Sequence, residues 1–141
     1  MKNKILVICT GNSCRSQMAE AYLRFFCEKE NIDAEIFSAG IEAHGVNSKV
    51  IEILKEDRID ISHHTSNKIE DYLNKGITHV ITVCDHANEH CPIFNENTIK
   101  IHHNFSDPTK VIGSVDSIND AFKKTREEIK SFSENYLKDN F

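Results

Sequence analysis

Apolar residues follow two patterns along the chain, short continuous runs and stripes with helical spacing. Runs rich in Ile and Val are typical of strands that are covered on both faces, and they occupy residues 4–9, 34–40, 79–84 and 98–102. Apolar residues three and four positions apart predict amphipathic helices over residues 17–30 and 46–58. A long C-terminal helix is predicted from the stripe Ile118, Phe122, Ile129, Phe132 and Tyr136.

Alternation of strands and helices predicts the fold class. It indicates an α/β domain in three layers, with a four-stranded, mainly parallel sheet and helices on both faces. A shorter helix over residues 68–73 is expected to be capped by Ser66. The pattern shows no internal repeat, low-complexity tract or linker, and 141 residues fit one domain. We therefore expect residues 1–141 to form a single domain.

Composition excludes several classes of partner. Apolar content of 39% and charged content of 28% are ordinary for a globular protein, and the net charge is -5. Without a broad basic field, neither nucleic acid nor an anionic membrane is an expected partner. No apolar run approaches the ~20 residues of a membrane span, and the N-terminus enters a strand without a signal-peptide pattern. We expect a cytoplasmic protein.

The chain has five cysteines and eight histidines. An odd number of cysteines in an intracellular chain does not describe a disulfide scaffold, and indicates catalytic thiols, redox thiols or metal ligands. Cys27 lies on a predicted helix and is interpreted as a small space-filling residue. A zinc site is one alternative, with candidate ligands Cys84, His86, His90 and Cys91. Paired short spacings such as C-x2-C are absent, so zinc is the weaker hypothesis, and the other paired histidines are interpreted as structural: His63, His64, His102 and His103.

The most informative stretch joins the first strand to the first helix, with the sequence Cys-Thr-Gly-Asn-Ser-Cys-Arg-Ser over residues 9–16. A loop that leads into a helix points its N–H groups inward, in the positive end of the helix dipole, and so can hold an oxyanion. Gly11 and Asn12 tolerate the backbone angles that such a loop needs. Arg15 adds a planar set of donors, and Cys9 is expected to ionise easily there. The alternative is a buried cysteine and a surface arginine, but C-x5-R in this context favours an anion-binding nucleophile.

Reactive residues also converge on one edge of the predicted sheet. In a parallel α/β sheet, ligands bind beyond the carboxyl ends of the strands, where Cys9, Cys84 and Asp107 are placed. Asp107 precedes Pro108, which stiffens its loop. Asp107 is therefore a candidate general acid for a leaving oxygen, and the alternative is an ordinary turn aspartate.

Cys84 and Cys91 lie seven residues apart. In a continuous helix they would be ~10.5 Å apart along the axis, whereas a disulfide needs Cα atoms within about 7 Å. Asp85, Asn88 and Pro92 make the segment a poor permanent helix. We predict a reversible Cys84–Cys91 disulfide that forms with local refolding.

Residues 9–20 resemble the active-site segment of thioredoxin-coupled arsenate reductases, which share the fold of low-molecular-weight protein tyrosine phosphatases. The resemblance covers nearly the whole chain in the same order. It continues through the motifs Ser38-Ala-Gly-Ile-Glu42, His44-Gly-Val-Asn47, Asp60-Ile-Ser62, His64-Thr-Ser66, Cys84-x6-Cys91-Pro92 and Asp107-Pro108. The phosphatases share the first loop and the Asp-Pro, but usually have Pro where this chain has Gln17, and lack the Cys84/Cys91 pair.

The resemblance implies reduction of arsenate to arsenite by a thiol relay. Cys9 would attack arsenate, Asp107 would protonate the departing oxygen, and Ser16 would hydrogen-bond the thiolate. The anion, with phosphate or sulfate as competitors, would be held by the loop residues Thr10, Gly11, Asn12, Ser13, Cys14 and Arg15. Cys84 would then attack the Cys9 adduct and Cys91 would resolve the resulting disulfide. Thioredoxin or a similar thiol donor would reduce the Cys84–Cys91 disulfide, with no bound cofactor.

Two positions depart from the families' patterns. Some relatives bind potassium through residues that correspond to Asn12, Glu20, Ser38 and an aspartate, which is Asn67 here. The lost charge leaves at most a weak potassium site, and no metal is expected to be required. Thr109 stands where tyrosine phosphatases usually place an aromatic residue, which favours the reductase. The alternatives that stay open are a phosphatase that uses Cys9, Arg15 and Asp107, and a non-enzymatic oxyanion or redox sensor.

Overall fold

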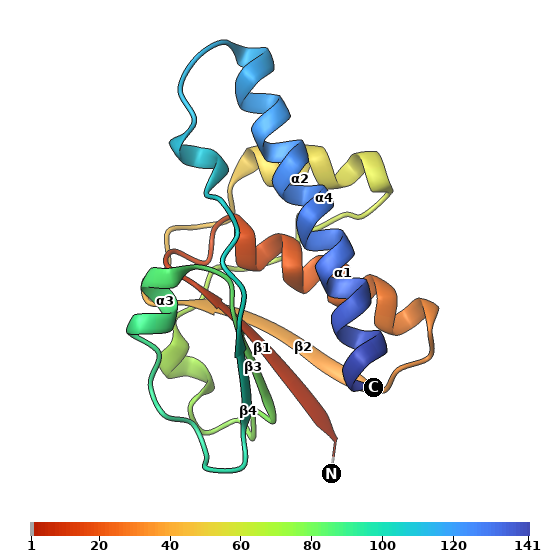
Figure 1. The fold of residues 1–141 in the computed structure, drawn as a ribbon, viewed down its shortest axis with the longest axis vertical. Coiled ribbons are helices and arrows are strands. Elements are labelled where there is room, and N and C mark those ends of the chain that lie inside the picture. Colours follow the sequence, from red (N-terminus) through yellow and green to blue (C-terminus); the bar gives the residue numbers. More distant parts are fainter. Residues whose placement is uncertain (1) are drawn as a thin grey trace.

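The computed structural model describes residues 2–141. Its sheet contains the strands β1 (Asn3–Cys9), β2 (Ala34–Gly40), β3 (His79–Thr82) and β4 (Ile99–His102). All neighbouring strands are parallel, in the order β2-β1-β3-β4 (Figure 1). Since β1 is central, its continuous apolar run from Ile5 to Ile8 is fully buried. The predicted fold class is confirmed.

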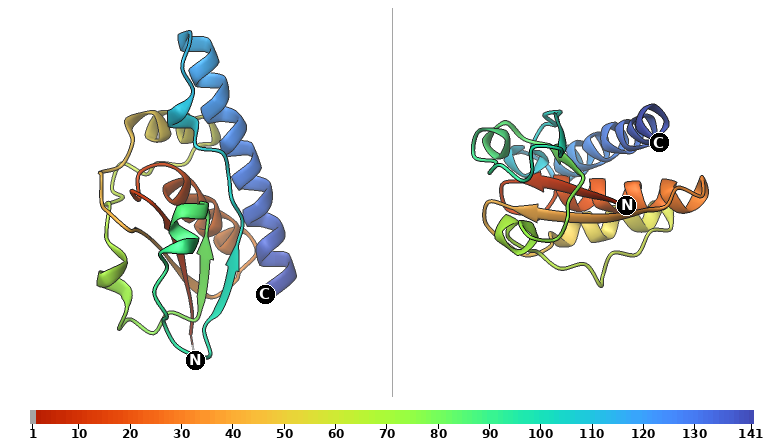
Figure 2. Two further views of the ribbon diagram at one scale, coloured as in Figure 1. Left: turned by 60° about the vertical axis from the view of Figure 1, so that its left-hand side comes forward. Right: turned by 90° about the horizontal axis from the view of Figure 1, so that it is seen from below.

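Helices cover both faces of this sheet. They are α1 (Arg15–Lys29), α2 (Ser48–Leu54), α3 (Asp85–Glu89) and α4 (Val115–Asn140), with 3-10 turns at Lys55–Asp57, Ile69–Tyr72 and Pro108–Lys110. The helices α1 and α4 pack together on one face, and α3 lies on the other (Figure 2). Among the helices of residues 2–141, none has the length and apolarity that a membrane span requires.

Local capping explains where the observed helices differ from the predicted ones. The predicted helix 46–58 begins at Ser48, because Asn47 Oδ1 accepts the Lys49 N–H at 2.8 Å. The α-helix ends at Leu54 and continues as the 3-10 turn Lys55–Asp57. The turn stops at Arg58, whose φ of 61° is left-handed. The predicted cap at Ser66 is wrong. The Ser66 hydroxyl instead donates to the carbonyl oxygens of residues 11 and 12, and so supports the loop after β1.

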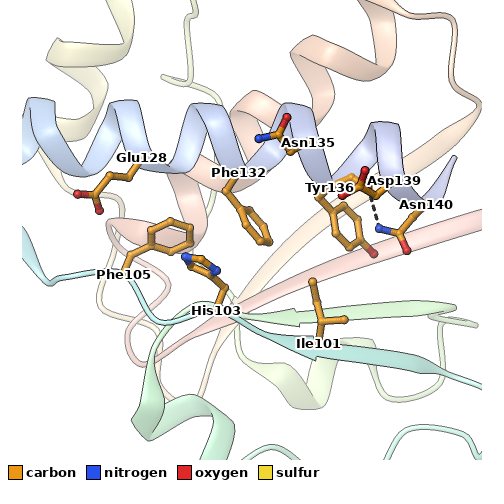
Figure 3. A pocket seen from close by; sticks show the side chains of 9 residues that line it. All are labelled: Ile101, His103, Phe105, Glu128, Phe132, Asn135, Tyr136, Asp139 and Asn140. Carbon is orange, nitrogen blue, oxygen red and sulfur yellow. Dashed lines mark hydrogen bonds between the residues drawn. The ribbon is translucent and has the colours of Figure 1, made fainter.

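The C-terminal helix completes the core. Phe122 and Ile129 of α4 are buried, as the stripe predicts, and Cys27 is buried on α1 as a space-filling residue. Beside them, rings of His103, Phe105 and Phe132 gather between the end of β4 and α4 (Figure 3), with centroids 4.5 to 5.5 Å apart. These aromatic residues line an open cavity of about 500 Å³. Among the described residues that line it there is no cysteine or arginine.

Candidate active site

Residues 9–16 form a tight loop between β1 and α1, and Asn12 is its internal brace. The backbone of Asn12 has a left-handed φ of 47°, a conformation that Asn tolerates. Its side chain is fully buried: Oδ1 accepts the Asn67 N–H at 2.8 Å, while Nδ2 donates to Ser16 Oγ at 2.8 Å and to Ser38 Oγ at 2.9 Å. Every polar atom of this amide is therefore engaged, so the loop has one well-defined conformation.

These bonds also orient Ser16 toward the candidate nucleophile. Because Ser16 Oγ accepts from Asn12, its own proton is free to point at Cys9 Sγ, 2.8 Å away. Cys9 is 3% exposed and closes β1 at the carboxyl edge of the sheet. The hydroxyl thus has the orientation required to donate to a thiolate, as the resemblance implies for Ser16.

Arg15 begins α1 and reaches over the loop toward Asp107. Arg15 Nη1 donates to the Phe105 carbonyl at 2.8 Å, and Nη2 lies 3.6 Å from Asp107 Oδ2. The other carboxylate oxygen, Oδ1, accepts from Thr109 N at 2.9 Å and Thr109 Oγ1 at 2.6 Å, and so caps the 3-10 turn that follows. One carboxylate oxygen of Asp107 thus stabilises the turn, as the alternative interpretation expected. The other oxygen faces Arg15.

The loop, Arg15 and Asp107 enclose a pocket of about 340 Å³. Its lining is Cys9, Thr10, Gly11, Ser13, Cys14, Arg15, His44, Asp107 and Thr109. Most of the predicted oxyanion-binding residues thus face one cavity, whereas the buried Asn12 and Ser16 stand behind it as supports. Burial raises the pKa of Cys14 to about 12, so this second pocket thiol stays protonated at neutral pH.

Cys84 lies at the edge of the loop, two residues beyond β3 rather than within the predicted strand. Its Sγ is 3.3 Å from Thr10 Oγ1, the residue after Cys9, and accepts the Ala87 N–H at 3.4 Å as the cap of α3. Cys84 is 3% exposed. Sequence reasoning correctly predicted that the ends of β1 and β3 bring Cys9 and Cys84 to the same edge.

Cys91 lies beyond the far end of α3, and all five cysteines are free thiols. Its side chain is partly buried, and burial raises its pKa, an effect that nearby Lys100 opposes. The structure is therefore that of the reduced protein, in which residues 85–89 form a short helix. Within residues 2–141, no three His, Cys, Asp or Glu side chains are grouped to hold a metal ion.

The four residues of the suggested potassium site lie close together but bind one another. Ser38 Oγ donates to Glu20 Oε1 at 2.6 Å, and Glu20 Oε2 pairs with Arg24 at 2.9 Å. The Asn67 amide is turned to Thr65. The Arg24 guanidinium balances the Glu20 charge, and the side-chain oxygens of Asn12, Glu20 and Ser38 already have hydrogen-bond partners, so in this arrangement these residues do not fit a potassium ion.

Two contributors to the site, His44 and Gln17, were not predicted from the sequence, whereas Thr109 lies at the substrate-facing position that the resemblance implies. His44 and Thr109 line the pocket, and His44 packs so closely on Gly11 that a Cβ there would meet Nδ1 at 2.5 Å. Gln17 donates to the carbonyl oxygens of Asn12 and Thr65 and accepts from His64 Nδ1 at 2.9 Å. Burial, with a smaller effect of nearby Arg24, lowers the pKa of His64 to about 4. The contacts of His44 and His64 with this loop and with Gln17 join segments far apart in sequence, so the sequence pattern could not anticipate them.

Comparison with known proteins places this geometry in a family. Residues 4–139 match the family described as low molecular weight phosphotyrosine protein phosphatase. The chain is 45% identical over 135 residues to the arsenate reductase of Staphylococcus xylosus, covering 96% of each chain.

Solved structures agree on the fold. The low molecular weight protein tyrosine phosphatase of T. tengcongensis superposes with a TM-score of 0.83 at 24% identity, covering 98% of this chain and 99% of that one. An arsenate reductase in the phosphate binding state has a TM-score of 0.64 at 27% identity, covering 94% and 97%. The chain belongs to the low molecular weight phosphotyrosine protein phosphatase family, in the branch that includes the arsenate reductases.

Proposed function

We propose that this protein reduces arsenate to arsenite by a thiol relay through Cys9, Cys84 and Cys91. One observation carries the proposal: the Cys84 sulfur lies beside Thr10, at the edge of the pocket that Cys9 lines. A hydrolase needs only the pocket, whereas a second thiol beside it provides a route for electrons. The high identity to a Staphylococcus xylosus arsenate reductase supports the same assignment.

The first step is formation of a covalent adduct. The loop amides and Arg15 bind the oxygens of arsenate, and the Cys9 thiolate attacks arsenic. Asp107, whose Oδ2 faces Arg15, protonates the departing oxygen, which leaves as water. Because the pocket recognises a tetrahedral oxyanion, phosphate and sulfate are expected to compete for it.

The second step moves two electrons onto arsenic. The Cys84 thiolate attacks Cys9 Sγ, the sulfur–arsenic bond breaks with its electron pair on arsenic, and arsenite leaves. A Cys9–Cys84 disulfide remains. The Cys91 thiolate then attacks Cys84 Sγ, which frees the Cys9 thiolate and leaves a Cys84–Cys91 disulfide. A thioredoxin dithiol reduces that disulfide and closes the cycle.

The test is NADPH oxidation with thioredoxin, thioredoxin reductase and arsenate, run beside hydrolysis of an aryl phosphate. We expect arsenate-dependent NADPH oxidation over many turnovers, lost in Cys84→Ser and in Cys91→Ser. Cys27→Ser is the matched control, because Cys27 is a buried thiol on α1 outside the relay. Aryl phosphate hydrolysis should survive in the Cys84 and Cys91 variants.

Hydrolysis without a relay is the second candidate function. It requires only Cys9, Arg15 and Asp107, with water cleaving the Cys9 intermediate. The pocket favours it less, because Thr109 lines the position from which an aromatic residue would pack on phosphotyrosine. Fast aryl phosphate hydrolysis with no arsenate-dependent NADPH oxidation would establish the phosphatase and overturn the reductase. Absence of both activities would favour a sensor.

A further inference from the structure

A polar cluster outside the pocket ties the start of α3 to the end of β4. His102, the last residue of β4, places Nε2 2.7 Å from Asp85 Oδ1, at the first residue of α3. The other ring nitrogen, Nδ1, is 2.8 Å from Thr82 Oγ1 and 3.2 Å from the Thr82 carbonyl oxygen. Nε2–H donates to Asp85 when the ring is charged, and also in the neutral ring when the Thr82 hydroxyl donates to Nδ1. The Asp85 N–H donates to Asn104 Oδ1 at 3.1 Å, just beyond β4.

Few apolar contacts hold α3 in place besides this cluster. Of its five residues, only Ala87 is buried. Asp85 is exposed, with 71% of its side chain accessible, while 27% of the His102 side chain is accessible. A short helix with one buried side chain is weakly anchored by packing. The contacts of Asp85 are therefore a large part of what fixes its first turn.

We infer that Asp85 and His102 are positioning residues for the thiol relay. Their hydrogen bond, the latch, holds the first turn of α3 against β4, and so keeps the adjacent Cys84 at the edge of the Cys9 pocket. The latch must open when Cys84 pairs with Cys91. This inference rests on the proposed relay and goes beyond it, because it assigns a role to a pair that touches neither substrate nor reacting sulfur.

The reason is geometric. Cys84 and Cys91 flank α3 at opposite ends, while a disulfide requires their Cα atoms within about 7 Å. Cys84 also has to leave its buried place as the cap of α3, where it accepts the Ala87 N–H. Asp85 is bonded to Cys84 through the chain, so this movement draws its carboxylate away from His102.

A contact made only in the dithiol form raises the reduction potential of the pair, since it stabilises the reduced protein over the disulfide. The latch thus opposes early closure of Cys84 on Cys91 before arsenate has reacted. It also helps thioredoxin, because a disulfide of higher potential is more readily reduced.

The test is a redox titration of the full-length protein against oxidised and reduced glutathione. The protein dithiol gives two electrons and two protons to one oxidised glutathione, forming the Cys84–Cys91 disulfide and two reduced glutathiones. The fraction oxidised is read by thiol trapping and mass spectrometry. Variants are His102→Leu, Asp85→Ala and the double variant, because these side chains can neither donate nor accept a hydrogen bond. The matched control is Asp33→Asn, which removes the same charge from an exposed pair with Lys2 beside the β2 edge.

We expect each single variant to favour the disulfide about 5-fold, a shift of about 20 mV to lower potential at 29.6 mV per tenfold. The double variant should add little to either single variant, because both remove the same contact. This cycle also separates the latch from direct effects of the Asp85 charge on α3 or on Cys84. Asp33→Asn should match the wild type.

An unchanged potential in His102→Leu, in protein whose circular dichroism matches the wild type, would overturn the latch. Fully additive effects would do the same, since the two side chains would then act independently. Failure of the proposed function is a distinct result. In that case the wild type shows no arsenate-dependent NADPH oxidation, whatever the glutathione titration gives.

Discussion

The two regions that carry the reactive sulfurs differ in how they are held. The loop of residues 9–16 is held by the buried Ser16 hydroxyl, which bonds to Cys9 and Asn12 within the loop. The buried amides of Asn12 and of the adjacent Gln17 also bond to segments distant in sequence. Across the pocket edge, α3 spans five residues, buries one of them, and is tied to β4 through a surface latch. The first region is held by several buried hydrogen bonds, and the second by one buried side chain and a few hydrogen bonds to β3 and β4.

This difference matches the two tasks of a thiol relay. Donors that stabilise a developing charge work best when they need no rearrangement, so the loop benefits from rigidity. A thiol that must meet one sulfur and then another cannot be equally rigid, because the two targets lie in different places. The comparison teaches that one small domain can place a fixed anion site and a movable electron carrier at neighbouring strand ends.

The largest expected effect tests whether Cys9, in the fixed region, is the nucleophile of both arsenate reduction and aryl phosphate hydrolysis. Cys9→Ser should lower arsenate reduction and aryl phosphate hydrolysis together, by about 10⁴-fold or more, because each needs the thiolate. Steady-state rates of both reactions check this. A variant that lost only one activity would show that the two reactions use different nucleophiles.

Backbone packing offers a direct contrast in stability between the two regions. At Gly40 a Cβ would meet the Glu42 carbonyl at 2.2 Å and Asn12 N at 2.7 Å, so Gly40→Ala must displace the loop backbone. We expect a loss of about 3 kcal/mol in the free energy of unfolding. Glu89→Ala, on exposed α3, should change it by less than about 0.5 kcal/mol. Urea denaturation of both variants tests the contrast, and similar losses would remove it.

Low pH should lower the free energy of unfolding through His64, which bonds to Gln17 beside the loop of residues 9–16. The His64 side chain is 3% exposed, and burial lowers its pKa from 6.5 to about 4. The unfolded chain therefore takes up a proton before the folded one, so this contribution to stability is complete above pH 6.5 and is lost as the pH falls to about 4. The Glu20 carboxylate, 3.6 Å from His64 Nε2, favours the charged ring and partly offsets this loss.

Urea unfolding at several pH values measures this effect. The wild type should lose stability steadily between pH 6.5 and 4, and His64→Asn should lose less over the same interval. The Asn amide nitrogen takes the place of Nδ1 and can still donate to the Gln17 amide, so the variant is a suitable control for the hydrogen bond. Parallel pH profiles for the two proteins would contradict the assignment to His64.

The smallest effect concerns a single hydrogen bond inside the loop. Ser16→Ala removes the hydroxyl that lies 2.8 Å from Cys9 Sγ. We expect Cys9 to react about tenfold more slowly with iodoacetamide at neutral pH, since a hydrogen bond to a charged acceptor contributes about 1.5 kcal/mol. Ser117→Ala, on the outer surface of α4, is the control. An unchanged rate would show that the loop amides alone keep the sulfur reactive.

Much of the fold follows from local sequence patterns. The run Ile5–Ile8 and the stripe containing Phe122 and Ile129 predicted buried elements that the structure confirms. The loop of residues 9–16 and the shared edge for Cys9, Cys84 and Asp107 followed from parallel topology. The catalytic roles of these residues stay predictions until the variants are measured.

Contacts that depend on register could not be anticipated. Ser66 was expected to cap a helix, yet it supports the Cys9 loop, because its partner carbonyls lie more than fifty residues away in sequence. The Asp85–His102 latch likewise exists only because β4 pairs with β3 so that His102 lies opposite Thr82. Sequence periodicity fixes which face a side chain occupies, but not which distant atom it meets.

Disulfide mapping after one turnover tests the relay most directly. Reduced protein is mixed with arsenate without any external reductant, quenched by thiol trapping, and digested for mass spectrometry. We predict one arsenite released per chain, a Cys84–Cys91 disulfide with Cys9 again free, and a Cys9–Cys84 disulfide in Cys91→Ser. Arsenite release with Cys84 and Cys91 both still reduced would contradict the relay.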